Sequence, residues 1–133
     1  MQMSNLKVPI SLGELIDKIT ILRIKSNKIN SNEAQKNIRS ELEKLEHILN
    51  TKISINNNLK NFEIKLSKIN QTLWDIEDQL REKEREKKFD KNFISLARMV
   101  YYKNDERAKI KRMINKSFGS ELIEEKSYTQ YSL

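Results

Sequence analysis

Apolar residues recur between positions 59 and 80 at alternating steps of three and four: Leu59, Phe62, Leu66, Ile69, Leu73, Ile76 and Leu80. A repeat of this kind places its members on one stripe only when the backbone is an α-helix. Water disfavours an uncovered apolar stripe of this length, so other helices have to pack against it. The sequence therefore predicts a long helix as the spine of a helical bundle.

The composition agrees with an all-α fold. Of the 133 residues, 34% are charged and 37% are hydrophobic, with only two Gly and one Pro. This mixture suits long amphipathic helices and leaves few turn-forming residues for a β-sheet. We expect a single helical domain over residues 1–133, a bundle or hairpin of about four helices with one long heptad-patterned helix. Residues 1–10 are expected to be an extended lead-in and residues 120–133 a short C-terminal tail.

Local signals predict where the helices begin and end. Ser11 and Glu14 have the spacing of a capping box, Asp90 is a good N-cap, and Gly119 suits a helix end. Residues 51–58 favour a break because they include three consecutive Asn, although a continuous helix would keep the heptad phase. The expected helices cover residues 12–28, 33–49, 59–87 and 91–116.

Several classes of site are disfavoured by composition. The chain has no cysteine, so it has no disulfide and no zinc–thiolate site, and His47 is the only histidine. No apolar run reaches the roughly 18 residues of a membrane span, and the N-terminus lacks a signal-peptide core. We expect a soluble, cytoplasmic protein without a membrane partner.

The last expected helix carries polar residues on its inward stripe. Apolar residues begin the stripe near Phe93 and resume it at Ile110, but Asn104 and Arg107 have the same helical phase between them. A charge inside a protein costs several kcal/mol unless it is paired. The alternatives are a pocket for an anionic ligand, a hydrogen-bonded layer that fixes helix register, and a face turned to solvent. The ligand-binding candidates on this helix are Arg98, Tyr101, Asn104, Asp105, Arg107 and Lys111.

A second group of candidates lies around an aromatic residue outside the heptad stripe. Trp74 is one helical turn from Asp78 and two turns from Arg81, and Glu77 borders the stripe. These carboxylates have the chemistry of metal ligands or of a general base. The alternative is that Trp74 packs against the first helix or a second subunit, with the acidic residues in ion pairs.

The first expected helix offers paired carboxylates followed by basic residues. Glu14 and Asp17 face the same way and, with Glu77 or Asp78, form a candidate Mg²⁺ site. This set is similar to the paired acidic residues of the all-helical nucleotide pyrophosphohydrolases. The same helix also resembles that of the helical chorismate mutases, which implies Arg23 and Lys28 as carboxylate binders. Lys18 is a further ligand-binding candidate.

The widest resemblance covers three segments of the chain. They are PISLGELIDKITILRIKSNKI from Pro9 to Ile29, INQTLWDIEDQLREKE from Ile69 to Glu84, and FDKNFISLARMVYYKNDERAKIKRMIN from Phe89 to Asn115. Together they resemble a family of small, uncharacterised, all-helical bacterial proteins. The resemblance implies the same fold and brings no known activity.

The net charge of +7 is concentrated on the first and last expected helices. Lys103, Arg107 and Lys111 form a basic stripe that could follow a phosphate backbone. No nucleic-acid-binding motif accompanies it, so nucleic acid is the less favoured partner. The acidic tail, with Glu124 and Glu125, is expected to fold back and neutralise part of this face.

These observations rank three functions. The first is a non-catalytic helical binding or assembly module without a cofactor, which forms a homo-oligomer through the helix at 59–87 or binds a protein partner. The second is a small protein or enzyme that binds a phosphorylated or carboxylated anion, such as a nucleotide, with Mg²⁺ as cofactor. The third is non-specific nucleic-acid binding. The sequence leaves open whether the protein is an enzyme and which residues would be catalytic.

Overall fold

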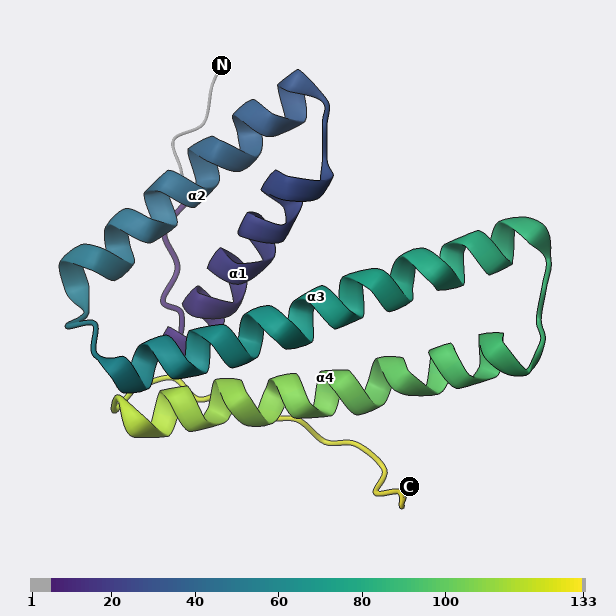
Figure 1. Ribbon diagram of the computed structural model, residues 1–133. Helices are drawn as coiled ribbons and strands as arrows, with labels where there is room; N and C mark the ends of the chain where they lie inside the picture. The colour runs from purple at the N-terminus through teal and green to yellow at the C-terminus, as the bar shows by residue number, and fades with distance from the viewer. Residues whose placement is uncertain (1–5, 133) are drawn as a thin grey trace.

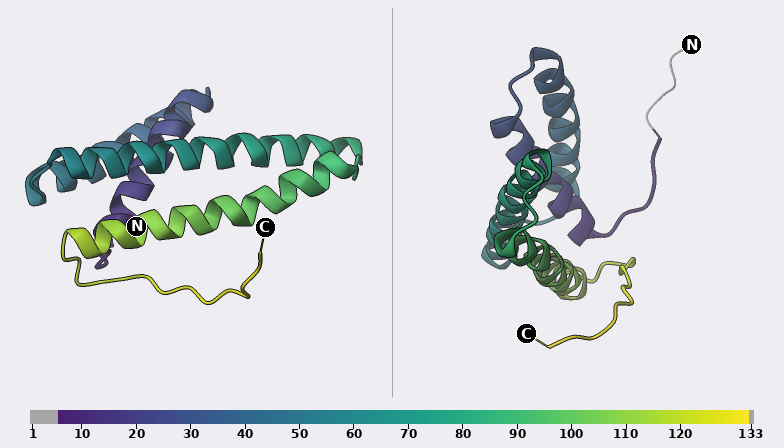
Figure 2. Two further views of the ribbon diagram at one scale, coloured as in Figure 1. Left: turned by 60° about the horizontal axis from the view of Figure 1, so that its bottom comes forward. Right: turned by 90° about the vertical axis from the view of Figure 1, so that its right-hand side faces the viewer.

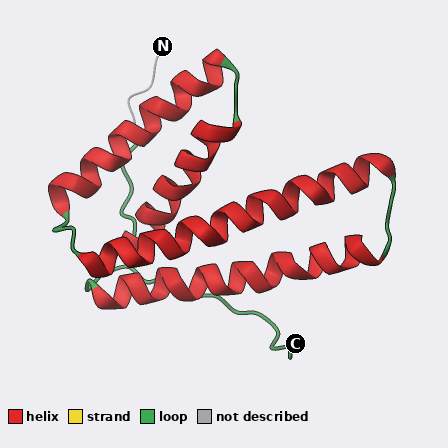
Figure 3. Ribbon diagram, viewed as in Figure 1, coloured by secondary structure: helices red, strands yellow, loops and turns green. Residues whose placement is uncertain are grey.

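The computed structural model describes residues 6–132 and is all-α over that range, as the sequence predicts (Figure 3). Its elements are four helices, α1 (Leu12–Lys28), α2 (Asn32–Lys52), α3 (Asn57–Glu86) and α4 (Lys91–Ser117). The expected break between the second and third helices is confirmed, but it is shorter than residues 51–58 because α2 continues to Lys52 and α3 begins at Asn57.

The helices form two hairpins of unequal length. Helices α3 and α4 lie antiparallel in a long hairpin, and the shorter α1–α2 hairpin crosses it near the end that holds the start of α3 and the end of α4 (Figure 1). Among these described helices α1 contacts all three others, whereas α2 contacts α1 alone. The far half of the α3–α4 hairpin therefore extends without a third helix beside it (Figure 2).

Each helix begins at a capping side chain. Ser11, Ser31, Asn56 and Asp90 each accept a hydrogen bond from the backbone N–H three residues later. Such caps pair amide groups that have no partner within the helix, which is why a local sequence signal predicts these starts. At the other end of α3, Lys87 adopts the left-handed conformation, with φ of 56°. The Lys88 N–H bonds back to the Lys83 carbonyl and closes the helix.

The apolar core lies where α1 crosses the long hairpin. Its fully buried members include Ile16 and Ile19 of α1, Leu59 and Leu66 of α3, and Ile114 of α4. Helix α1 is apolar on more than one side because it lies between neighbours.

The stripe on α3 differs from the heptad prediction at one turn. Asn70 is buried and Ile69 is only half-buried, so the stripe passes through a polar residue. Ile69 and Asn70 are consecutive residues on neighbouring sides of the helix, and Asn70 is the one whose side chain faces α1. Leu80, the last member of the predicted stripe, is also half-buried.

The start of α1 is fastened to the end of α4. The Gly13 N–H donates to Asn115 Oδ1 at 2.7 Å, and the Leu12 N–H donates to Ser120 Oγ at 3.4 Å. A Cβ atom on Gly13 would lie only 2.6 Å from the carbonyl oxygen of Lys111. This contact explains why the first turn of α1 needs glycine.

Candidate functional site

A buried carboxylate joins three helices at the centre of the molecule. Asp17 of α1 is only 1% exposed and accepts two hydrogen bonds from the Arg107 guanidinium of α4, one of them from Nε at 2.9 Å. Asn70 Nδ2 of α3 donates to Asp17 Oδ1 and to Thr20 Oγ1, both at 2.9 Å. The Thr20 hydroxyl in turn donates to the Asp17 carbonyl at 2.8 Å.

Lys111 extends this arrangement toward the protein surface. Its Nζ lies 2.7 Å from a Glu14 carboxylate oxygen, 3.8 Å from Asp17 Oδ2 and 3.5 Å from Glu124 of the C-terminal tail. The Glu14 side chain therefore pairs with Lys111, while the Glu14 backbone N–H donates a hydrogen bond to Ser11 Oγ. Arg107 also donates to Asn104 Oδ1 at 3.3 Å. We call the set of Glu14, Asp17, Thr20, Asn70, Asn104, Arg107 and Lys111 the Asp17 network.

Asp17 and Arg107 stabilise each other's charged forms. Burial raises the pKa of Asp17, but hydrogen bonds from Arg107 and Asn70 and the nearby positive charges outweigh burial and hold the pKa below its ordinary value. The hydrogen bond to Asp17 likewise raises the pKa of Arg107 despite burial. Within residues 6–132 every buried side-chain nitrogen and oxygen has a hydrogen-bond partner, so this polar layer is fully paired.

The polar interruption in α4 is therefore matched by polar residues on α1 and α3. The sequence singled out Asn104, Arg107 and Asp17 but did not connect them, and it missed Thr20, Asn70 and the buried Asn115. A usable signal existed for Asn70, which is four residues after Leu66 and three before Leu73, as a heptad member would be.

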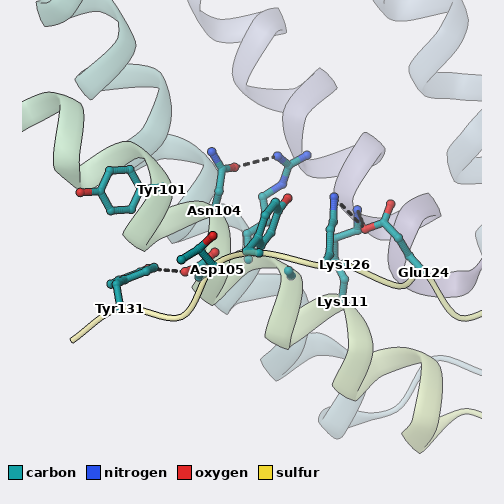
Figure 4. Close-up of a pocket in the computed structure, with 11 residues that line it drawn as sticks. Tyr101, Asn104, Asp105, Lys111, Glu124, Lys126 and Tyr131 are labelled. Atoms are coloured by element: carbon teal, nitrogen blue, oxygen red, sulfur yellow. Dashed lines mark hydrogen bonds and ion pairs between the residues drawn. The ribbon is translucent and has the colours of Figure 1, made fainter. Parts of the chain in front are cut away.

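A cavity of about 340 Å³ lies between α4 and the C-terminal tail (Figure 4). On the α4 side it is lined by several predicted ligand-binding residues, namely Tyr101, Asn104, Asp105, Arg107 and Lys111. The tail contributes Glu124, Lys126, Tyr128, Thr129 and Tyr131. The sequence offered a pocket on this face of the helix as one alternative, but it did not identify the tail residues that complete the cavity, because the path of the tail is not encoded in a local pattern.

The candidates on α3 line a second hollow, a groove of about 590 Å³ that shares Asn104 and Arg107 with the cavity. Ile21 and Ile24 of α1 line it as well, so Trp74 and the first helix border the same groove. The α3 candidates in this groove are Trp74, Glu77, Asp78 and Arg81.

Three predicted ligand-binding residues line neither hollow. Lys18 lies 3.9 Å from Glu14 one turn away. Arg23 pairs with Glu46 of α2 and Glu63 of α3, and thereby ties α1 to both helices. The Arg98 guanidinium donates to the Tyr102 hydroxyl at 2.8 Å on α4.

The carboxylates of the predicted Mg²⁺ site are held apart. Glu14 and Asp17 face Arg107 and Lys111, whereas Glu77 and Asp78 are exposed on α3. In the described part of the chain no group of three or more metal-ligating side chains is gathered. Mg²⁺ binding stays a prediction without a preformed cluster.

The tail does fold back on α4, as its acidic composition predicts. Glu124 reaches Lys111, and Glu125 lies 3.1 Å from Arg112. Part of the basic face is thereby neutralised. The apolar residues Leu122 and Ile123 stay exposed, so the tail is held by charge and by Tyr131, whose ring packs on Tyr101.

These features define a small all-α protein, two crossed hairpins joined by a buried ion-pair network. Across the described residues, no helix is both long and apolar enough to cross a membrane. The chain belongs to a family of unknown function, DUF6165, whose model matches residues 6–132. This match confirms the resemblance to a family without known activity. No curated protein and no solved structure matches the chain.

Proposed function

We propose that the protein is a cytoplasmic, non-catalytic assembly module that pairs with a second copy of itself through the far half of the α3–α4 hairpin. The observation that carries this proposal is the amount of surface. The chain exposes 9929 Å² for a mass of 15.8 kDa. A compact monomer of that mass exposes about 7,300 Å². The exposed irregular segments at residues 6–10 and 121–132 contribute to this excess, which is larger than the roughly 800 Å² that each partner buries in a standard interface.

The apolar residues of the far half support the same surface. Phe93, Leu96 and Val100 share one face of α4 by their spacing and are only half-buried, and Ile94 is 56% exposed. Two helices alone cannot cover such residues, because each helix has a stripe wider than one neighbour covers. Two hairpins packed by two-fold symmetry would complete a four-helix bundle.

The stripe first predicted for self-association, on α3, is mostly filled within one copy. Leu73 and Ile76 are buried, whereas Ile69 and Leu80 are half-buried. We therefore propose that the contact lies on α4 and at the turn between α3 and α4, and not on the α3 stripe. Charges there alternate in sign from Arg81 to Lys87, so two copies would not repel strongly.

The test is the mass in solution by light scattering or sedimentation. We expect wild-type protein to have about twice the mass of one chain. Ile94→Glu should yield the monomer, because a carboxylate would be forced into the contact. Ile64→Glu is the matched control, since Ile64 is 54% exposed on the near half of α3 and should leave the dimer intact. A wild-type monomer at high concentration, or equal effects of both variants, would refute the proposal.

The other functions have weaker support. The cations that were expected to bind an anion, Arg107 and Lys111, already face protein carboxylates. Nucleic-acid binding is disfavoured because Glu124 and Glu125 pair with two of the basic residues of α4 that would contact phosphates.

A further inference from the structure

The cavity between α4 and the tail has two chemically different ends. At one end the rings of Tyr101 and Tyr131 meet edge to face with centroids 5.4 Å apart, and Tyr128 joins them in the lining (Figure 4). At the other end lie the ammonium groups of Lys111 and Lys126. Its volume of about 340 Å³ lies within the range of small-molecule sites.

We propose that this cavity binds a small molecule made of a planar ring joined to one carboxylate or phosphate group. The ring would pack on the tyrosine end, where aromatic faces and edges give favourable contacts. The anionic group would bind between Lys111 and Lys126, where charge-assisted hydrogen bonds are strongest. The neighbouring Asp105 accepts a hydrogen bond from the Tyr131 hydroxyl, so it serves the tyrosine end and does not oppose the anion directly.

Glu124 of the tail holds the place of that anion in the free protein. Its carboxylate lies 3.5 Å from Lys111 Nζ and 3.4 Å from Lys126 Nζ. Glu14, by contrast, approaches Lys111 to 2.7 Å and belongs to a helix. The tail carboxylate is 42% exposed and carried by a segment without regular structure. Among the carboxylates at Lys111 it is the one that a ligand can displace.

The local charge favours an anion once Glu124 moves away. With the tail in place, three carboxylates around this end balance three cations. The set comprises Glu14, Asp17 and Glu124 against Arg107, Lys111 and Lys126. Without Glu124 one positive charge is in excess, which a carboxylate or phosphate on the ligand neutralises.

Calorimetric titration of the full chain tests the proposal with two kinds of probe. Whole probes carry both a ring and an anionic group, and half probes carry only one of the two. Adenosine 5′-monophosphate and 4-hydroxybenzoate carry both a ring and an anion, and they distinguish a phosphate from a carboxylate. Adenosine supplies a ring alone and inorganic phosphate an anion alone. We expect saturable binding of at least one whole probe, at least tenfold tighter than either half. Absence of saturable binding by both whole probes, or equal binding of inorganic phosphate, would overturn the proposal.

Variants of exposed residues then identify the site without disturbing the core. Glu124→Gln should tighten binding about two- to fivefold, because it removes a competing exposed ion pair. Lys126→Ala and Tyr128→Ala should each weaken it at least fivefold. Lys116→Ala is the control, because Lys116 is an exposed lysine of α4 outside the cavity lining and should change nothing. Weaker or unchanged binding in Glu124→Gln would overturn the proposal, since a cationic ligand would lose a partner there.

Discussion

At the scale of single residues, Asp17 decides how the three central helices fit together. Moving a carboxylate out of water costs several kcal/mol, and the cost is offset only by good pairing. Asp17 has such pairing, with two hydrogen bonds from Arg107, one from Asn70 and the charge of Lys111 nearby. The arrangement binds three helices at one point, so loss of the carboxylate leaves Arg107 without its ion-pair partner, while Lys111 keeps Glu14.

We therefore expect Asp17→Asn to lower the free energy of unfolding by about 3 kcal/mol. Breaking a buried pair costs roughly 3–5 kcal/mol, and the low end applies because the Arg107 side chain is 28% exposed and partly screened by water. Urea denaturation at pH 7 measures the loss. Glu106→Gln is the control, since its pair with Lys103 is exposed and should be worth less than about 1 kcal/mol. Equal losses in the two variants would show that Asp17 is not special.

The same substitution should also change how stability depends on pH. Because the pKa of Asp17 is lowered in the folded state, its contribution is complete above the ordinary value of about 3.9 and is lost as the pH falls through the lower folded-state value. The difference between wild type and Asp17→Asn should therefore shrink in acid below about pH 4. A difference that stays constant from pH 7 to pH 3 would contradict this account.

At the scale of helices, the sequence predicts starts and ends well because their signals are local. Ser11 and Asp90 cap the helices they were expected to cap, and the helix ends were predicted to within a few residues. The contact between Asp17 and Arg107 was not predicted, although both residues were singled out. They are 90 positions apart, and only the packing of α1 across α4 brings them together. The burial of Asn70 in place of Ile69 has the same origin, because the position of α1 determines which side of α3 is buried.

The junction between α1 and α4 gives a prediction in which two helix effects oppose each other. Gly13→Ala raises helix propensity by about 1 kcal/mol. Yet its methyl group would lie 2.6 Å from the Lys111 carbonyl oxygen and 2.9 Å from Asn115 Oδ1. Overpacking of this kind costs about 1–3 kcal/mol and would also strain the hydrogen bond from the Gly13 N–H.

We expect Gly13→Ala to be net destabilising in thermal or urea denaturation. Ser40→Ala, at an exposed position inside α2, is the control for propensity alone and should be neutral or slightly stabilising. A stabilising Gly13→Ala would mean that the two helices are not packed as closely as this contact requires.

At the scale of the whole molecule, packing is unevenly distributed among the helices. Helix α1 meets all the others, and α3 and α4 meet along their length, but α2 contacts α1 alone among the described helices. Only Ile38 and Leu49 of α2 are buried, against a run of buried residues through α1. Apolar burial supplies most of the stabilisation of a folded segment, so α2 should separate from the body before the rest unfolds.

Native-state hydrogen exchange measures this difference directly. We expect the amides in the middle of α2 to open at a lower free energy than those of α1 and of α3 between Leu59 and Ile76, because local opening of α2 exposes little apolar surface. The Arg23 pairs with Glu46 and Glu63 provide a control on the cause, since Glu46→Gln removes only the link to α2. That variant should lower the opening energy of α2 and leave α3 unchanged. If α2 and α3 instead exchange with one common free energy, the two hairpins unfold as a single cooperative unit. The sparse contacts of α2 would then be sufficient to hold this helix on the body until the whole molecule unfolds.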